Sequence, residues 1–383
     1  MPSSSPRIVH LISEYSEREA MGRTVTETAR RVDGEHFLIT TQAHDHPDAF
    51  TEIVEVGGSI TTFPMRSIDA VRAALDRISP DVVHVHAGAL GPLFSSVSGF
   101  AGLPLVMTIY AWPVLPRPKA WRNASVAQMR ASNVLQARVA LTTVVPALAV
   151  SAALRRLGLS SVLTPDPRVR QKLSRDKHLR VVALKSGAPI DSRRAQWTDG
   201  PPTILFAGRA ESVRGIDTVL DAFGLIRQQV PDARLRLLLI PRPELPELLR
   251  AAKAADYGTD LEVVTEPVPD LLAEMAAAQV GVWPFKFDYT TSPPAMAVAE
   301  ALSVGLPVVA TDVACVRAVM TNERNGLLVP PGNPVMLADA VSRLLVKEQQ
   351  WRRFAEAGPL SVADFSWDHA AQTTAEQYRA IFQ

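Results

Sequence analysis

The chain has 383 residues, of which 47% are hydrophobic and 21% are charged. This length favours two domains, and the composition allows each domain to bury a core of its own. The formal net charge of +1 argues against a dedicated nucleic-acid-binding protein, which needs a strong basic excess. A single cysteine, Cys315, excludes an internal disulfide and a cysteine metal cluster, so a reducing compartment fits.

Targeting segments are not evident in the sequence. The apolar run after Arg7 is too short for the core of a signal peptide. The longest weakly polar stretch, Val139 to Leu154, is interrupted by polar residues and proline and is short for a membrane span. We interpret it as buried structure, with docking on a membrane surface as the alternative. The expected location is cytoplasmic, with peripheral contact at the inner face of the membrane as the alternative.

Apolar, β-branched runs recur along the first half of the chain, each followed by a helix-like segment. Strands are expected at 7–13, 36–41, 81–87, 104–110, 161–164 and 179–185. Continuous apolar strands with helices between them are typical of a parallel sheet covered on both faces. The following segment, Ser186–Pro202, is rich in proline, glycine and charge, and we interpret it as a linker.

The same pattern restarts in the second half. Strands are expected at 203–209, 234–241, 261–266, 280–285, 307–313 and 326–332. The sequence therefore predicts an α/β protein with two doubly wound, Rossmann-like domains, 1–192 and 193–383. A C-terminal helix near 365–383 is allowed to pack back on the first domain. Because such sheets bind ligands at the carboxyl ends of their strands, the two domains are expected to face each other across a ligand-binding cleft.

A candidate phosphate site opens the second domain, in Phe206–Phe223 (FAGRAESVRGIDTVLDAF). Gly208 permits close approach of a ligand to the backbone, and Arg209 and Arg214 stand at a strand–loop–helix junction. Two guanidinium groups can hold a diphosphate there, and the helix N-terminus adds a favourable dipole. From the spacing alone, a surface loop with two solvated arginines explains the pattern equally well. Neither a GxGxxG nor a Walker-type loop is present here.

Several segments resemble glycosyltransferase family 4, whose members have the GT-B fold. Gly208–Phe223 resembles the family's GR-x(3–4)-KG-x(4)-LL-x-AF element, with Arg214 at the usual lysine position. Ala299–Val313, Asn325–Leu345 and Phe365–Phe382 resemble later family segments in the same order. In the first half, DVVHVHA and LRVVALKSGAPID show a partial likeness. The resemblance implies a GT-B fold and covers nearly all of the second domain.

The resemblance implies donor-binding roles for residues around the helix that contains Glu300. In the family, a glutamate at this position accepts hydrogen bonds from the ribose hydroxyls of the donor; from the residues alone, a surface glutamate is the competing interpretation. The family's E-x7-E pattern has Ser292 at its first position here, which supplies no negative charge. Two prolines replace the family's loop before the helix. The backbone N–H groups of Ala295 and Met296 are therefore expected to contact the diphosphate, because proline has none.

The first domain departs further from the family pattern. Tyr110 replaces the histidine of the family's T-x-H and does not titrate near neutral pH. The family's Gly-Gly loop is reduced to Met21 and Gly22 on the acceptor side. His86 is expected either as a catalytic side chain facing the cleft or as a core or capping histidine. Trp112 begins a Trp- and Pro-rich segment that forms either an acceptor platform or a packed loop.

The resemblance implies a glycosyltransferase that moves a sugar from a nucleotide-diphosphate sugar to an acceptor hydroxyl with retention of configuration, and we expect a bacterial source. Arg209 and Arg214 would stabilise the leaving diphosphate. It implies neither a metal nor a cofactor: no DxD-like pair is placed to hold a metal, and His44, Asp45, His46 and Asp48 are interpreted as a solvated loop. UDP or GDP is favoured as the nucleotide. The acceptor is a small molecule, a glycan or a lipid-linked group; its identity, the sugar and the oligomeric state are not predicted.

Two alternatives stay open. A transferase-like protein that binds a nucleotide or a partner without turnover would explain Ser292 and Tyr110, although Arg209, Arg214 and Glu300 all remain. A nucleotide-sugar epimerase is the weaker alternative, because such an enzyme needs several acid–base groups around the sugar.

Overall fold

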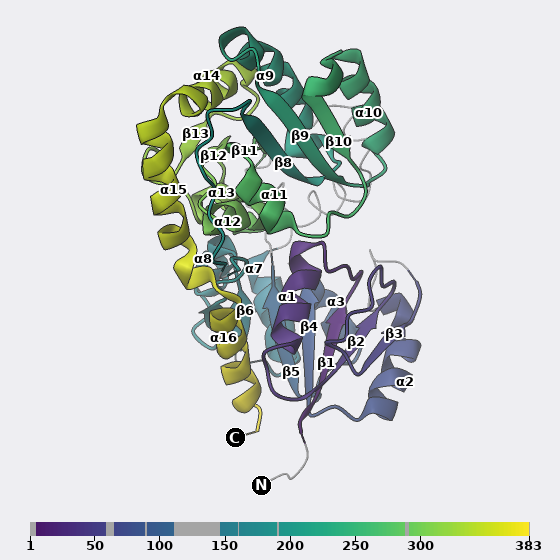
Figure 1. Ribbon diagram of the computed structural model, residues 1–383. Helices are drawn as coiled ribbons and strands as arrows, with labels where there is room; N and C mark the ends of the chain where they lie inside the picture. Colours follow the sequence, from purple (N-terminus) through teal and green to yellow (C-terminus); the bar gives the residue numbers. More distant parts are fainter. Residues whose placement is uncertain are drawn as a thin grey trace. The chain divides into compact units, whose positions relative to one another are not determined.

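The computed structural model describes residues 5–58, 65–88, 90–110, 146–159, 161–189, 191–287 and 291–382. They form two compact units, which we call unit 1 (Met1–Ser186 with Trp367–Gln383) and unit 2 (Gly187–Ser366) (Figure 1). Each unit contains one parallel sheet with helices around it, so the predicted fold class of two doubly wound domains is confirmed. The chain passes into unit 2 at Gly187, inside the predicted linker and before the predicted boundary at 192/193.

The sheet of unit 1 has the strand order β3-β2-β1-β4-β5-β6-β7, and each described pairing is parallel. Its strands are β1 (Arg7–Ile12), β2 (Glu35–Thr40), β3 (Glu52–Glu55), β4 (Val82–Ala87), β5 (Leu105–Ile109), β6 (Ser161–Thr164) and β7 (Arg180–Ala183). Among the described strands of this sheet, the sequence pattern missed β3 alone, which is short, half-exposed and at the edge of the sheet. An edge strand needs no continuous apolar run, so its sequence EIVE lacks the signal that marks the buried strands.

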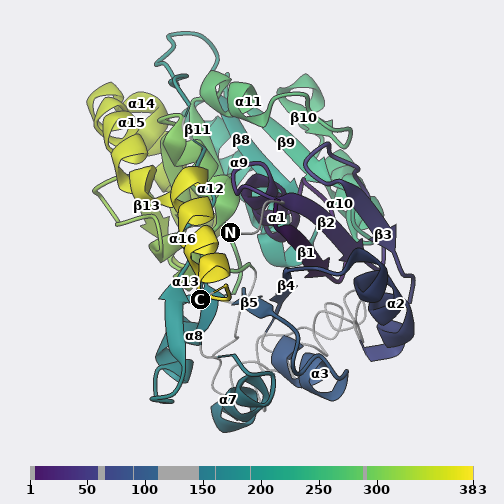
Figure 2. The ribbon, with the colours of Figure 1, turned by 90° about the horizontal axis from the view of Figure 1, so that it is seen from below.

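Helices cover both faces of this sheet. The described ones are α1 (Ala20–Ala29), η1 (Met65–Ser67), α2 (Ile68–Ile78), α3 (Gly91–Val97), α7 (Ala147–Arg156), α8 (Pro167–Leu173) and α16 (Trp367–Arg379). Figure 2 shows α1 and α16 on one side of the sheet and α2, α3 and α7 on the other. The C-terminal helix α16 packs beside α1, and the Tyr378 hydroxyl lies 2.7 Å from Nδ1 of His84 on β4. The last helix of the chain therefore completes unit 1.

The weakly polar stretch from Val139 to Leu154 is described only from residue 146 onward. In that part α7 buries Val150 and Leu154 in the core of unit 1, as the interpretation of buried structure predicts. No helix among the described residues has both the length and the apolar character needed to cross a membrane.

The sheet of unit 2 has the strand order β10-β9-β8-β11-β12-β13, again parallel. Its strands are β8 (Thr203–Arg209), β9 (Arg234–Ile240), β10 (Leu261–Val264), β11 (Val280–Trp283), β12 (Val308–Thr311) and β13 (Leu327–Val329). Its helical elements are η2 (Ser212–Arg214), α9 (Ile216–Gln229), α10 (Leu245–Ala254), η3 (Gly258–Asp260), α11 (Leu271–Ala277), α12 (Met296–Ser303), α13 (Ala314–Arg317), α14 (Pro334–Val346), α15 (Glu348–Val362) and η4 (Ala363–Phe365). The order runs outward from β8 and β11 in opposite directions, which places a topological switch point between these two strands.

Candidate functional site

The candidate site lies at the carboxyl end of β8, beside the switch point of the unit 2 sheet. Gly208 and Arg209 are the last two residues of β8, and Arg214 ends η2 just before α9. The Glu211 carboxylate lies between the two guanidinium groups, with Oε1 3.7 Å from Nη1 of Arg209 and Oε2 3.3 Å from Nε of Arg214. The structure therefore brings both predicted arginines together, with their positions set by one shared carboxylate.

Glu211 was missed by the sequence reasoning. The spacing in the sequence could have indicated it, because an acidic residue three positions before Arg214 in a helical turn lies within reach of that side chain. Arg209, Glu211 and Arg214 carry two positive charges and one negative charge between them. A bridging carboxylate of this kind holds two like charges close together before any anionic ligand arrives.

Arg214 is the more enclosed of the two arginines. Burial lowers the pKa of its guanidinium, Glu211 raises it and Arg209 lowers it. Arginine nevertheless stays protonated in proteins, so the side chain remains a fixed positive charge. Its Cζ atom lies 5.6 Å from the centroid of the Phe285 ring, within the range of a cation–π contact. Glu211 and Phe285 together restrict where this charge can point.

Gly215 allows the turn between η2 and α9. It has a φ of +79°, in the left-handed region, and a Cβ atom there would lie 2.0 Å from the carbonyl oxygen of Pro284. The first turn of α9 is also tied to the segment after β11, because Asp217 forms an ion pair with Lys286. Glycine thus permits the close approach of α9 to the end of β11 that positions Arg214.

Replacing Gly215 with alanine is expected to lower the free energy of unfolding of unit 2 by about 2–5 kcal/mol, from left-handed strain of about 1–2 kcal/mol together with overpacking of about 1–3 kcal/mol. Gly332→Ala is the matched control, since its φ is +71° but nothing lies within 4 Å of the added Cβ. The free energy of unfolding of this control should fall only by the left-handed strain. Urea unfolding of both variants measures the difference, and equal losses would show that the approach to Pro284 is not tight.

Glu300 lies inside α12 and is only 4% exposed. The competing interpretation of a surface glutamate is therefore wrong. Ser292 and Met296 are partly exposed, and Met296 is the first residue of α12. A carboxylate enclosed on a helix at the binding edge of a doubly wound sheet is a candidate ligand group.

The expected role of the Ala295 backbone needs correction. Its N–H donates to the carbonyl oxygen of Cys315 at 3.0 Å. This N–H is therefore engaged within the protein and is not available to donate to a diphosphate. The sequence could not reveal this, because the bond links the start of α12 to α13. Gly187 also lies against this corner: a Cβ there would lie 3.4 Å from the Met296 side chain.

Side-chain hydrogen bonds tie the carboxyl ends of three strands together around this site. The Trp283 indole N–H donates to the Ala207 carbonyl at 2.9 Å, and the Thr311 hydroxyl donates to the Phe285 carbonyl at 2.7 Å. The carbonyl oxygen of Cys315 accepts from the Ala295 N–H. Cys315 also lies close enough to Arg214 to raise the pKa of its guanidinium. The ends of β8, β11 and β12 and the start of α12 thus form one connected edge of unit 2.

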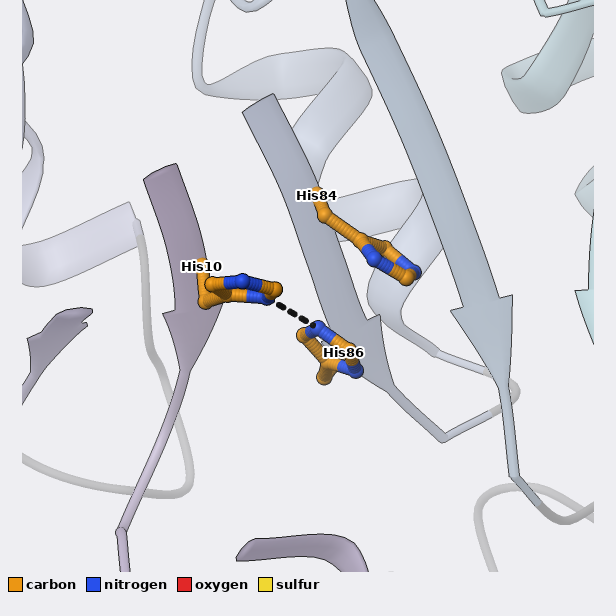
Figure 3. Close-up of side chains that lie close together, drawn as sticks. All are labelled: His10, His84 and His86. Carbon is orange, nitrogen blue, oxygen red and sulfur yellow. Dashed lines mark hydrogen bonds between the residues drawn. The ribbon is translucent and has the colours of Figure 1, made fainter. Parts of the chain in front are cut away.

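The candidate residues that the sequence placed in unit 1 are described within that unit alone. His86 is 4% exposed and hydrogen bonded through Nδ1 to the Tyr110 hydroxyl at 3.0 Å, so of the two alternatives the core histidine holds. Tyr110 directly follows β5 and is 6% exposed, and burial raises the pKa of its hydroxyl. Figure 3 shows that His86 also faces His10 of the neighbouring strand.

Met21 and Gly22 belong to the first turns of α1 and not to a loop, which corrects that expectation. A Cβ at Gly22 would lie 2.1 Å from the Ser16 carbonyl oxygen, so the glycine serves the close approach of the β1–α1 loop. The side chains of the supposed metal-like cluster contact separate partners: His44 contacts Glu14, and Asp45 accepts from Ser16 and the Glu17 backbone. Trp112 lies outside the described residues.

Comparison with known proteins finds similarity to glycosyltransferases, with the family match inside unit 2. Residues 201–347 match the family described as glycosyl transferases group 1. The D-inositol 3-phosphate glycosyltransferase of Nocardioides sp. is 32% identical over 208 residues, which cover 50% of this chain and 45% of the relative. The alpha-D-kanosaminyltransferase of Streptomyces kanamyceticus is 27% identical over 203 residues, or 51% of each chain. The chain thus spans about half the length of the curated relatives it matches.

Solved structures resemble the whole chain. Sucrose-phosphate synthase from Thermosynechococcus elongatus has a TM-score of 0.75 at 18% identity, covering 98% of this chain and 99% of its own. HepE from Anabaena, solved with UDP and glucose, has a TM-score of 0.72 at 15% identity, covering 98% of this chain and 100% of its own. At these identities the likeness establishes the fold, which is of the GT-B class.

Proposed function

We propose that this chain is a glycosyltransferase that moves a sugar from a nucleotide-diphosphate sugar to an acceptor hydroxyl. The observation that carries the proposal is the pair of guanidinium groups of Arg209 and Arg214, held by Glu211 at the switch point of the unit 2 sheet. Ligands of doubly wound sheets bind at this edge, and paired arginines suit a diphosphate. The family match over residues 201–347 and the named activities of the relatives support it.

Unit 2 would bind the donor. Arg209 and Arg214 would contact the diphosphate, and Gly208 would let it approach the end of β8. The Glu300 carboxylate would accept hydrogen bonds from the ribose hydroxyls. Ser292 and the start of α12 at Met296 would lie toward the sugar and phosphates. UDP is the favoured nucleotide, because HepE, of similar fold, was solved with UDP and with UDP-glucose.

The chemistry would need stabilisation of the leaving group above all. Negative charge grows on the diphosphate as its bond to the sugar breaks, and preorganised cations aimed at that charge lower the barrier. We propose transfer with retention of configuration and without a metal or a cofactor. The two arginines would balance the negative charge of the diphosphate, as a metal ion does in other enzymes. Unit 1 would bind the acceptor, a small molecule, a glycan or a lipid-linked group.

A nucleotide panel tests donor binding. UDP, GDP, ADP, TDP and CDP are compared by thermal shift, and UDP is expected to raise the melting temperature most. A ligand at about 100 times its Kd stabilises the native state by about 2.7 kcal/mol, which such a scan resolves. If none of the five nucleotides raises the melting temperature, the proposed donor site is wrong, and a transferase-like protein without turnover becomes the better interpretation.

Replacing Glu300 with glutamine is expected to weaken the binding of the active nucleotide about 10- to 100-fold, because hydrogen bonds to a charged group contribute about 1.5–3 kcal/mol. Glutamine keeps the volume of the buried side chain and removes its charge. Glu348→Gln, on the exposed start of α15, is the control and should bind like the wild type. Titration calorimetry measures both variants, and equal Kd values would remove Glu300 from the ribose site.

A further inference from the structure

Four buried histidines lie on one face of the unit 1 sheet. His10 of β1 is in register with His84 of β4, and Ile8 and Ile12 of β1 are in register with His36 and His86. Residues two apart on a strand share a face, so all four imidazoles point to the side that α1 and α16 cover. Their exposed fractions are between 0% and 4%. Figure 3 shows three of them, with His10 and His86 pointing toward each other.

Three of these histidines form a continuous hydrogen-bonded chain. Nε2 of His36 lies 2.8 Å from the Val32 carbonyl oxygen, and Nδ1 of His36 lies 2.9 Å from Nε2 of His10. Nδ1 of His10 lies 3.1 Å from Nε2 of His86, whose Nδ1 lies 3.0 Å from the Tyr110 hydroxyl. Both nitrogens of each imidazole are therefore engaged, from β2 across β1 and β4 to the end of β5.

The chain continues from Tyr110 into α1. The Tyr110 hydroxyl is hydrogen bonded to the Thr24 side chain, and the Thr24 hydroxyl lies 2.8 Å from the Ala20 carbonyl oxygen. The resulting set, which we call the relay, comprises His36, His10, His86, Tyr110 and Thr24. It begins and ends at a backbone carbonyl, and a carbonyl can only accept.

Counting protons shows what this relay can do. Each of its five side chains carries one transferable proton when neutral, because a neutral imidazole has one N–H and each hydroxyl has one O–H. The relay has six contacts, two of them to carbonyl acceptors. The neutral relay is therefore one proton short, and a single added proton completes all six hydrogen bonds.

The direction of the neutral relay is set at His36. The Val32 carbonyl requires a proton on Nε2 of His36, so Nδ1 of His36 accepts from Nε2 of His10. By the same reasoning His86 donates from Nε2 to His10, and Tyr110 donates to Nδ1 of His86. Thr24 then donates to Tyr110, so the hydrogen bond that the Thr24 hydroxyl donates to the Ala20 carbonyl in this structure is the one given up in the neutral relay. The Ala20 carbonyl lies in the first turn of α1 and can still accept from the helix backbone.

We propose that the relay is a one-proton switch in which uptake of a proton reverses the hydrogen bond between His86 and Tyr110. In the filled relay every contact holds one proton, and the two carbonyls fix the outermost two. Wherever the positive charge rests among the three imidazoles, Nδ1 of His86 must then donate to Tyr110. The Tyr110 hydroxyl donates in turn to Thr24, and Thr24 donates to Ala20.

The surroundings of the relay favour the neutral form at neutral pH. Burial, followed by the neighbouring imidazoles, lowers the pKa of His10 and His86 well below the ordinary value. Burial also lowers the pKa of His36, while its bond to Val32 opposes the shift, so His36 is the favoured place for the charge.

Within the part of the chain that the structure describes, the other groups facing the relay are uncharged at neutral pH. From β4 the His84 ring lies 3.9 Å from His86, centroid to centroid, and from α16 Tyr378 contacts His84. α1 adds the buried hydroxyl of Thr28 beside Thr24. The charged groups that α1 and α16 share, Glu27, Arg31 and Asp368, pair with one another at the exposed edge.

A metal ion is the competing occupant of this cluster. Atoms of His10, His84 and His86 that could ligate a metal lie within 4.8 Å of one another. However, both ring nitrogens of His84 are engaged, with Tyr378 and with Thr108 at 2.8 Å, as are those of His10 and His86. A metal would have to break a hydrogen bond at each of the three rings. Among the described residues, no carboxylate contributes to the pKa shifts of these histidines, so none lies beside them to balance the charge of a metal.

The switch matters because of where it ends. Tyr110 follows β5 at the carboxyl end of the unit 1 sheet, the edge at which doubly wound sheets bind ligands. Proton uptake changes what its hydroxyl accepts and donates without moving the backbone. This inference does not depend on the proposed transferase activity.

The experiment is long-range ¹H–¹⁵N correlation NMR of the full chain labelled at histidine, which reports the tautomer of each ring. At about pH 8, where an ordinary imidazole is neutral, His36, His10 and His86 should all carry the proton on Nε2. On acidification, His86 should acquire a proton on Nδ1 as the three rings take up one proton together. The exposed rings of His46 and His178 serve as references in the same spectrum.

Matched variants on α1 separate the relay from general packing. Thr24→Val removes the acceptor for the Tyr110 proton, so the uptake midpoint should fall by about one pH unit, a tenfold loss for one hydrogen bond. Thr24→Ser should restore it. Thr28→Val, one turn further and equally buried, removes a hydroxyl outside the relay and should leave the midpoint unchanged.

Three results would overturn the proposal. The first is a proton on Nδ1 of His10 or His86 at about pH 8. The second is equal midpoints in Thr24→Val and Thr28→Val. The third is stoichiometric binding of added ZnCl₂ with changes at the ring nitrogens of His10, His84 and His86, which would establish the metal site instead.

Discussion

Replacing Arg209 with alanine is expected to lower kcat for sugar transfer by about 10²–10³-fold, the loss that follows removal of one preorganised donor to a developing anion. Arg209 ends β8 and is held by Glu211 at 3.7 Å beside Arg214. Its guanidinium would meet charge that grows on the diphosphate only as the bond to the sugar breaks. The effect should therefore fall mainly on kcat and less on KM.

The control for Arg209→Ala is Arg227→Ala. Arg227 lies in the last turn of α9, has a side chain 33% exposed compared with 31% for Arg209, and pairs with Asp260 at 2.7 Å. Its replacement should leave kcat unchanged. Arg209→Lys keeps the charge and loses the planar fork, so its activity should fall between those of wild type and alanine. Near-full activity in Arg209→Ala would refute the transferase assignment.

The strands were predictable because most of them are buried on both faces. Runs such as DVVHVHA and TILFAGR are rich in buried apolar residues, and they became β4 and β8. The edge strand β3 has only half-buried positions and escaped detection. Arg209 and Arg214 were also predictable, since both stand at one local strand–loop–helix junction with Glu211 between them. The contacts of this junction with Pro284 and Phe285 were not predictable from the local pattern.

The rest of the site depends on contacts between distant segments. The bond from Ala295 to Cys315 and the packing of Gly187 on Met296 join residues that no local pattern relates. The relay had a sequence signal that was not used: His10, His36 and His86 all stand inside apolar strand runs. Their connection requires the register of three strands, which a single sequence does not supply.

The buried histidines predict that unit 1 loses stability as the pH falls below about 6.5, the ordinary pKa of the unfolded imidazole. Burial is the largest of the causes that lower the pKa of His10, His84 and His86 in the folded state. The unfolded chain therefore binds more protons than the folded chain, and stability rises with pH in this range. The pKa of His36 is lowered by burial as well. With all four imidazoles neutral the slope approaches about 5 kcal/mol per pH unit, and about 4 once the relay takes up its one proton.

Unit 2 provides the control within the same chain, because all eight histidines lie outside residues 187–366. Hydrogen exchange, corrected for the intrinsic effect of pH, should show β1 and β4 losing protection between about pH 7.5 and 5.5 while β8 and β9 keep theirs; ordinary carboxylates titrate lower, near pH 4. His84→Gln should reduce the slope in unit 1 by about 1.4 kcal/mol per pH unit, whereas His178→Gln, at an exposed position, should not. Parallel loss in both units would show that the pH dependence has another origin. Loss confined to unit 1 would mean that acid loosens the proposed acceptor unit while the proposed donor unit stays folded, so nucleotide binding would persist at a pH where transfer has already ceased.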